Sequence, residues 1–327
     1  MNRQTINNIG VFTSGGDAPG MNAALRAIVR TAVYHGKNVF AITGGYEGMI
    51  NGDIKQMGRR SVSNIIQSGG TVIKTARSER FRTAQGRKQA FENLQKFGID
   101  AVVAIGGDGT FRGCTELYKE HNVRIVGVPG TIDNDIYGTD FTIGYDTAVN
   151  TAIEAIDKIR DTAHSHDRFF IIEVMGRDAG FICLEAGIAG GAESILIPEI
   201  KTDVDKLCSR IKSLFDRGKT SNIVVVAEGD DAGGADKIGA KINEQTGLDY
   251  RVAILGHIQR GGRPTAKDRL LACKLGYWAV KHIIEGKANV MVGEINGKIE
   301  LTDLEDTFGK KKSIDTDTLE MATVLAC

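Results

Sequence analysis

Two apolar runs of the chain each end abruptly in glycine and aspartate. The run from Ala101 to Ile105 leads into GGDGT, which contains Asp108, and the run from Arg124 to Val128 leads into PGTIDND, which contains Asp133 and Asp135. Both runs have the length and the β-branched content of buried strands. Because parallel strands present their chemistry at their carboxyl ends, we expect the three carboxylates to lie close together in one crevice.

Glycine loops, carboxylates and arginines together suit phosphoryl transfer, which needs positioning, cations around the moving group and an acceptor for the proton of the attacking hydroxyl. Asp108 has glycine on both sides and could hold Mg2+, directly or through water, while phosphates approach the glycines. Asp133 follows a turn at Pro129 and Gly130 and is the better candidate for a general base. For Asp135, capping or bracing of the loop is an equal alternative.

Other loops point to anion binding. The loop from Ser14 to Gly20 follows an apolar run and precedes a helical segment, an order that directs backbone N–H groups toward a phosphate. It lacks both the GxGxxG spacing and the P-loop lysine, and a tight turn without a ligand is the alternative. The segment TARSERFR concentrates Arg77, Arg80 and Arg82, which suit phosphate but equally a plain surface cluster. Arg177 follows the run FFIIEV, at a strand end where a charge should face a crevice.

Composition restricts the partners. Lys and Arg number 41, as do Asp and Glu, so any anion must be held by local basic clusters, and we expect neither nucleic acid nor membrane as a partner. Neither a membrane span nor a signal peptide is evident, which favours a soluble, cytoplasmic protein. The five cysteines lack CxxC spacing and are expected to be reduced thiols.

The repeated order of strand, glycine break and helix predicts an α/β protein with mainly parallel sheet. A domain boundary is expected near Gly144, and the tail with Asp315 to Thr318 is expected to be a solvated edge. The expected strands are 8–13, 38–43, 101–105, 124–128, 169–174, 194–198, 222–228 and 250–255, and the expected helices are 21–35, 85–97, 110–121, 146–162, 203–217 and 265–285.

Five motifs together resemble the bacterial ATP-dependent 6-phosphofructokinases. They are SGGDAPGMN from Ser14, GGDGT from Gly106, PGTIDND from Pro129, MGR from Met175 and GHIQRGG from Gly256, in the family's order over nearly the whole chain. GGDGT alone would not be specific, since lipid and NAD kinases carry a similar string. The resemblance implies the phosphofructokinase fold, with two Rossmann-like three-layer α/β/α domains. The larger, ATP-binding domain would comprise 1–143 and about 258–308, and the smaller, fructose 6-phosphate-binding domain 144–257 and about 309–327.

The implied activity is Mg2+-dependent transfer of the ATP γ-phosphoryl group to the 1-hydroxyl of fructose 6-phosphate, a committed step of glycolysis. Asp133 would be the base, with Thr131 and Arg177 beside it in catalysis, and Asp108 would lie at the Mg2+. The implied ATP-binding residues are Gly16, Arg77, Ser78, Gly107, Asp108, Gly109 and Thr110. The implied substrate-binding residues are Thr131, Ile132, Asp133, Arg168, Met175, Gly176, Arg177, Glu228, Arg251, His257, Ile258, Gln259 and Arg260.

The resemblance also implies a homotetramer and an effector site. In the family, the arginines matching Arg168 and Arg251 reach the sugar's 6-phosphate from a neighbouring subunit, so active sites would be shared. The residues implied to bind ADP or phosphoenolpyruvate are Arg26, Arg30, Arg59, Arg160, Gly191, Ala192, Glu193, Arg217 and Lys219. Four positions depart from the Tyr, Asp, Lys and His of regulated members, namely Arg60, Asn64, Thr220 and Ser221. They leave the identity of the effector open.

Two glycines address the phosphoryl donor. Diphosphate-dependent relatives usually have Asp at the position matching Gly109 and Lys at that matching Gly130, so glycine at both favours ATP. Ser78 stands where a Phe is common, beside the donor-side arginine. A diphosphate-dependent enzyme and a non-catalytic sugar-phosphate or nucleotide sensor are the alternatives. The sensor is disfavoured because both Asp108 and Asp133 are present.

Overall fold

The computed structural model describes residues 6–166, 169–219 and 222–325, and two compact units account for the chain. The domain limits expected from the sequence remain predictions. Unit 1 consists of Met1–Thr131, Ile136–Thr147 and Arg260–Lys312, and unit 2 consists of Ile132–Asp135, Ala148–Gln259 and Ser313–Cys327.

Unit 1 contains a seven-stranded sheet in the order β11-β10-β5-β4-β1-β2-β3. Its central strands pair in parallel, whereas β2 with β3 and β10 with β11 are antiparallel pairs at the two edges. All six residues of β4 are buried, as expected for a central strand covered by helices on both faces. The strands are β1 (Asn8–Thr13), β2 (Asn38–Ile42), β3 (Ile54–Met57), β4 (Ala101–Gly106), β5 (Arg124–Pro129), β10 (Val290–Ile295) and β11 (Lys298–Asp303).

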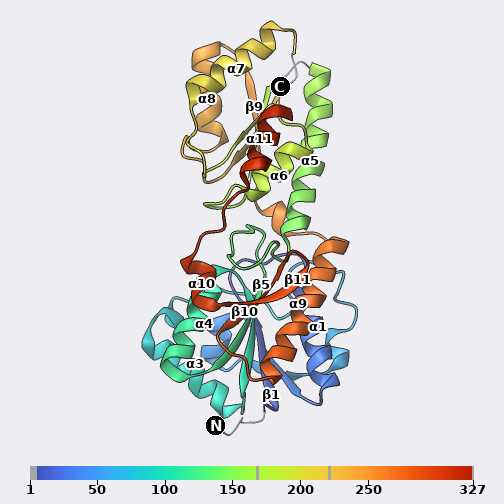
Figure 1. The fold of residues 1–327 in the computed structure, drawn as a ribbon, viewed down its shortest axis with the longest axis vertical. Coiled ribbons are helices and arrows are strands. Elements are labelled where there is room, and N and C mark those ends of the chain that lie inside the picture. The colour runs from blue at the N-terminus through green and yellow to red at the C-terminus, as the bar shows by residue number, and fades with distance from the viewer. Residues whose placement is uncertain (1–5, 167–168, 220–221, 326–327) are drawn as a thin grey trace. The chain divides into compact units, whose positions relative to one another are not determined.

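Helices cover both faces of this sheet, with α1 and α9 packed against each other on one face and α3 and α4 on the other (Figure 1). The second face packs a buried hydrophobic cluster that includes Phe12, Tyr46, Phe81 and Phe111. The helices are α1 (Met21–Tyr34), α2 (Gly45–Asn51), α3 (Ala84–Lys96), α4 (Asp108–His121), α9 (Ala266–Ile284) and α10 (Leu304–Gly309), with short 3-10 helices η1 (Arg59–Val62) and η2 (Arg80–Arg82).

Unit 2 contains a four-stranded, all-parallel sheet in the order β7-β8-β6-β9. Its core packs β6 and β8 against α7 and α8, with Phe169, Ile211 and Ile238 fully buried. The strands are β6 (Phe169–Val174), β7 (Ser194–Leu196), β8 (Asn222–Ala227) and β9 (Tyr250–Ile254). The helices are α5 (Tyr145–His166), which begins in unit 1, α6 (Phe181–Ala189), α7 (Val204–Asp216), α8 (Ala235–Thr246), α11 (Thr316–Leu325) and the 3-10 helix η3 (Gly256–Arg260).

The expected mainly parallel α/β architecture is confirmed, whereas the antiparallel pairs at the two edges were not predicted. Strand β3 is short and half polar, so it has no buried apolar run to find. The β10–β11 hairpin did have a local signal: Asn296 and Gly297 both adopt positive φ, of 50° and 76°, the conformation that a tight hairpin turn favours in Asn-Gly.

Asp315, Thr316 and Asp317 are exposed, as expected for a solvated edge, and Asp315 also begins a helix. Asp315 Oδ2 accepts hydrogen bonds from the backbone N–H and the hydroxyl of Thr318, at 3.1 and 2.9 Å, and so caps helix α11. The polar residues there serve as a helix start. None of the described helices is long and apolar enough to cross a membrane.

Candidate active site

In unit 1, the first glycine loop and GGDGT are joined at the ends of β1 and β4. Thr110 Oγ1 donates to the carbonyl of Ser14 at 3.1 Å, and Ser14 N donates to Ile105 O at 3.1 Å. A Cβ on Gly106 would lie 2.7 Å from Ser14 O, so only glycine permits this approach. The two loops predicted to bind the nucleotide are therefore held against each other.

Helix α4 begins at Asp108 in an open environment. No side chain caps its start, and a Cβ on Gly109 would meet nothing within 4 Å. The backbone N–H groups at a helix start, beside glycine, suit a phosphate. The Asp108 side chain is 39% exposed and lies 3.8 Å from Arg112.

A Mg2+ site at Asp108 fits the donors in the described residues. These residues contain no group of three or more His, Cys, Asp or Glu side chains that could form a complete metal cage. Mg2+ is commonly held by one or two carboxylates together with substrate phosphates and water, so a single half-exposed carboxylate beside a loop predicted to bind phosphate fits this ion.

Tyr46 supports the start of α4, a role that its sequence context did not predict. Its buried hydroxyl donates to Thr110 O at 2.5 Å, and its ring stacks on Phe81 at 3.8 Å between centroids. Burial raises the pKa of Tyr46 well above its usual value, which keeps the hydroxyl a donor. The only sequence signal was its place in the glycine break after β2.

The segment with Arg77 and Ser78 is anchored to the first glycine loop. Thr75 Oγ1 donates to Gly15 O at 2.8 Å, and Ser78 Oγ donates to Glu47 Oε2 at 2.5 Å. The Ser78 hydrogen bond, followed by that from Arg80, lowers the pKa of Glu47. Arg77 is exposed beside this anchored segment. The predicted ATP-binding residues thus belong to two loops and the start of α4, which hydrogen bonds within unit 1 hold together.

Arg260 also lies against the first glycine loop, where its Nη1 donates to Asp17 O at 3.3 Å. The family resemblance implies that Arg260 binds the sugar phosphate, and that role remains a prediction. The structure adds a contact with the loop expected to hold ATP.

The PGTIDND segment, at the end of β5, starts next to GGDGT, at the end of β4. Gly130 N donates to Gly106 O at 2.9 Å, and the Thr131 carbonyl accepts from Thr142 Oγ1 at 2.6 Å. Asp108 belongs to unit 1, whereas Asp133 and Asp135 belong to unit 2. Their expected clustering therefore remains a prediction.

In unit 2, a carboxylate and a guanidinium are paired. Asp133 is only 2% exposed, and its Oδ2 lies 3.5 Å from Arg177 Nε. The neighbouring Ile132 is fully buried, whereas the Arg177 side chain is 48% exposed. In such a pair, the nearly buried carboxylate can take up a proton, and the half-exposed cation beside it can face a reacting phosphoryl group.

The loop that carries Arg177 is strained and is held from two sides. Arg177 has a φ of 53°, which L-residues seldom adopt. Glu228 Oε1 accepts from Gly176 N at 3.2 Å and from Arg177 N at 2.8 Å. Gln259 is fully buried, and its Oε1 accepts from Met175 N at 2.9 Å. Glu228 and Gln259, expected to bind substrate, here position the loop.

The remaining predicted substrate residues lie at exposed positions or outside the described part. His257 and Ile258 are exposed in η3, and Arg251 is exposed on β9 with its Nη1 donating to Tyr250 O at 3.0 Å. Arg168 lies outside the described residues, so its predicted role stays as stated.

Four of the predicted effector residues gather in unit 2. Glu193, 2% exposed, accepts from Ile223 N at 2.6 Å and lies 2.9 Å from Lys219 Nζ and 3.6 Å from Arg160 Nη1. Arg160 also donates to the carbonyl of Gly191 at 2.6 Å. Ala192 is buried and Arg217 is exposed.

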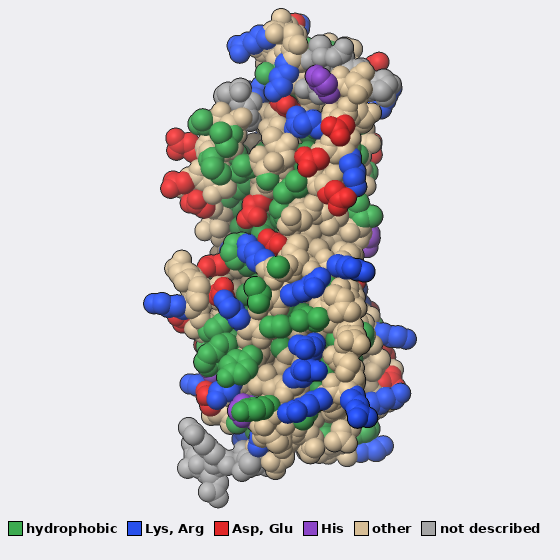
Figure 2. Space-filling view, turned by 90° about the vertical axis from the view of Figure 1, so that its right-hand side faces the viewer, with side chains coloured by type: hydrophobic (Ala, Val, Ile, Leu, Met, Phe, Trp, Pro, Cys, Tyr) green, Lys and Arg blue, Asp and Glu red, His purple; other side chains and the backbone are tan. Residues whose placement is uncertain are grey.

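Other predicted effector residues belong to unit 1. Arg26 and Arg30 lie on α1 and Arg59 in η1. The face of unit 1 formed by α1 and α9 carries a group of Lys and Arg side chains with few acids among them (Figure 2). Thr220 and Ser221, two of the four departures from the regulated pattern, lie outside the described residues.

Comparison with known proteins decides the family. Residues 8–283 match the phosphofructokinase family. The chain belongs to that family. It is 56% identical over 321 residues to "ATP-dependent 6-phosphofructokinase 1" of Thermus thermophilus, covering 98% of this chain and all of that one.

Solved structures agree on the fold. A solved structure of phosphofructokinase from Saccharomyces cerevisiae is 39% identical in sequence and has a TM-score of 0.87. The match covers 98% of this chain and 48%, about half, of the yeast chain. A pyrophosphate-dependent phosphofructokinase from Marinobacter aquaeolei has a TM-score of 0.84 at 23% identity, with 98% of this chain and 91% of that one covered. At that identity the likeness concerns the fold alone.

Proposed function

We propose that this chain is an ATP-dependent 6-phosphofructokinase, which transfers the γ-phosphoryl group of ATP to the 1-hydroxyl of fructose 6-phosphate. The observation that carries the proposal is the buried Asp133 carboxylate paired with Arg177 at 3.5 Å, on a loop held by Glu228 and Gln259. A binding protein would not need a proton acceptor beside a cation at this place.

In the proposed reaction, the sugar's 1-hydroxyl attacks the γ-phosphorus while Asp133 accepts its proton. A bond from that oxygen to phosphorus forms, the bond to the bridging oxygen of ATP breaks, and ADP leaves. Arg177 counters the charge on the transferring group. Asp108 would hold Mg2+, which supplies positive charge to the phosphates when bound. The products are ADP and fructose 1,6-bisphosphate.

The two donor-side glycines have different surroundings. A Cβ on Gly109 would meet nothing within 4 Å, whereas one on Gly130 would lie 3.0 Å from Ile105 Cγ2 and 3.3 Å from Met21 Cε. Space beside Gly109 supports a donor as large as a nucleotide. A longer side chain at Gly130 would have to displace two buried side chains.

The test of the function is a coupled assay of the purified protein with fructose 6-phosphate and Mg2+, given ATP or diphosphate in parallel. We expect turnover with ATP and at most trace turnover with diphosphate. The reverse preference would overturn the donor assignment, and inactivity with both would favour a sensor.

Gly109→Asp should weaken ATP binding selectively. Because the position is open, we expect the melting temperature to be unchanged or slightly raised, since an acid suits the first turn of α4. The added carboxylate would repel the phosphates, and the KM for ATP should rise at least about tenfold. Gly109→Ala is the matched control and should keep the KM for ATP within about threefold. An unchanged KM in Gly109→Asp would contradict the placement of ATP.

We further propose a homotetramer with shared active sites and an effector site. Strand β9 supports the first proposal because it is an edge strand of its sheet, with Arg251 exposed on it and Ile254 56% exposed. The Glu193 group with Lys219 and Arg160 supports an anion pocket for ADP or phosphoenolpyruvate. Sedimentation and saturation curves in fructose 6-phosphate, with and without these effectors, test the two proposals.

A further inference from the structure

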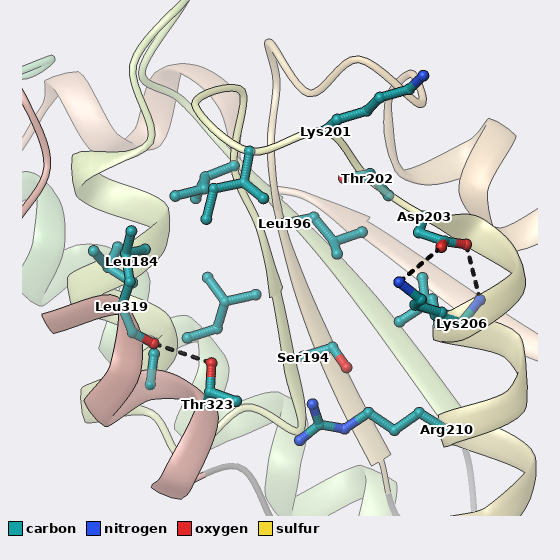
Figure 3. Close-up of a pocket in the computed structure, with 15 residues that line it drawn as sticks. Leu184, Ser194, Leu196, Lys201, Thr202, Asp203, Lys206, Arg210, Leu319 and Thr323 are labelled. Atoms are coloured by element: carbon teal, nitrogen blue, oxygen red, sulfur yellow. Dashed lines mark hydrogen bonds and ion pairs between the residues drawn. The ribbon is translucent and has the colours of Figure 1, made fainter. Parts of the chain in front are cut away.

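A cavity of about 280 Å3 lies within unit 2 and is lined by none of the residues assigned above to ATP, sugar phosphate or effector. Its walls come from α6, β7, the segment 197–203, α7 and the C-terminal helix α11 (Figure 3). Much of the lining is aliphatic, contributed by Leu184, Ile195, Leu196, Leu207, Leu319 and Ala322.

The charged side chains of this cavity are mostly basic. Lys201, Lys206 and Arg210 line it together with one carboxylate, Asp203. Asp203 is already engaged, because it accepts from the backbone N–H of Lys206 at 3.1 Å and lies 3.3 Å from its Nζ. The half-buried Arg210 extends from α7 across the lower end of the cavity, below Ser194 and toward α11, whereas Lys201 points outward (Figure 3).

We propose that this cavity binds a small amphipathic carboxylate. Its acyl chain would lie among Leu184, Leu196 and Leu319, where it removes apolar surface from water. Its carboxylate would meet the Arg210 guanidinium, whose planar fork matches carboxylate geometry. One water molecule takes up ~30 Å3 in the liquid, so the volume corresponds to about nine waters and suits a small ligand such as octanoate.

Helix α11 leaves room for such a ligand to add stability. None of its residues is fully buried, and Val324 and Leu325 are 64% and 65% exposed. A chain seated against Leu319 and Ala322 would bury apolar surface that the helix now leaves partly open. Binding should therefore raise the melting temperature as mass action requires.

The cavity wall is connected to the loop that carries Arg177. Glu199, within the segment 197–203, accepts from Gly180 N at 2.8 and 3.1 Å, at the end of the loop containing Arg177. Thr202 in the same segment donates its hydroxyl to Asp230 Oδ2 at 2.8 Å, two residues beyond Glu228. A ligand that shifts the segment 197–203 would move hydrogen-bond partners on both sides of the Arg177 loop. The affinity for fructose 6-phosphate should therefore change.

The direct test is calorimetric titration of the whole protein with octanoate, with 1-octanol and acetate as probes lacking the charge or the chain. We expect saturable binding of octanoate, at least about tenfold weaker binding of octanol, and none of acetate. Arg210→Met keeps the aliphatic stem and should weaken the binding of octanoate at least about tenfold. Ala322→Phe should abolish binding by filling the cavity.

Matched controls separate the cavity from the general surface. Lys212→Met removes a charge from the same helix, and Met321→Phe adds a ring to α11, both outside the lining, so octanoate should bind both as it binds the wild type. Absence of saturable binding to the wild type, or unaltered binding to Arg210→Met and Ala322→Phe, would overturn the proposal.

The connection to the Arg177 loop has its own readout and rests on the proposed function. With octanoate saturating, the KM for fructose 6-phosphate should shift at least about twofold in the wild type and not in Ala322→Phe. An unchanged KM despite binding would refute the connection. Inactivity with both phosphoryl donors would instead overturn the proposed function and leave the binding result standing.

Discussion

Asp133→Asn should lower kcat at least ~10²-fold while changing the KM for fructose 6-phosphate only a few-fold. The amide keeps the size of the carboxylate but cannot take the proton of the attacking hydroxyl. Asp133 is nearly buried, and its side chain lies 3.5 Å from Arg177 Nε. Asp133→Ser, which removes the carboxylate altogether, should lose kcat to a similar extent. Steady-state kinetics with both substrates varied measure these effects.

The matched control is Asp135→Asn, in the same loop. If Asp135 only braces the loop, kcat should stay within about tenfold of the wild type. A large loss in Asp135→Asn together with a small one in Asp133→Asn would exchange the two roles. Circular dichroism and melting temperature show whether each variant remains folded.

Asp268→Ala should destabilise the protein by about 3 kcal/mol or more, because it leaves buried donors without an acceptor. Asp268 is 1% exposed on α9, and its carboxylate accepts from Gly144 N at 2.8 Å, from Thr147 N at 2.8 Å and from Thr147 Oγ1 at 2.5 Å. These bonds fix the start of α5 to α9 within unit 1. Denaturant unfolding measures the loss.

The pH dependence has a definite sign. Burial raises the pKa of Asp268, and the hydrogen bonds from Thr147 and Gly144 offset the rise only partly. The folded state therefore holds this proton more tightly than the unfolded state, and the contribution of Asp268 to stability falls as the pH rises from its unfolded pKa through its folded pKa. The cost of Asp268→Ala should thus be greater at acidic than at neutral pH.

Glu285→Ala is the control, since it removes an exposed carboxylate at the other end of α9. We expect a change within about 0.5 kcal/mol, with no pH trend like that of Asp268. A cost for Asp268→Ala as small as this would show that the three donors find other partners, and a cost that grows toward neutral pH would contradict the direction of the pKa shift.

The sequence by itself determined the central parallel strands and predicted the chemistry at their ends. Apolar runs such as Ala101 to Ile105 have strand length, and the glycine and aspartate that follow favour the binding of phosphate, metal or a proton, with turns and loop bracing as the alternatives. These signals are local, because each is carried by residues adjacent in the chain. The ordered motifs sufficed to identify the family.

Only the tertiary structure decided which side chains hold others in place. Gln259 is 84 residues from Met175 and Tyr46 is 64 residues from Thr110, so no local pattern announces either hydrogen bond. The polar residues before α11 are exposed as expected, but the helix that they begin was not predicted, because a helix cap and an exposed loop have similar compositions. The cavity is lined by α6, β7, α7 and α11, and it exists only because the fold brings these distant segments together.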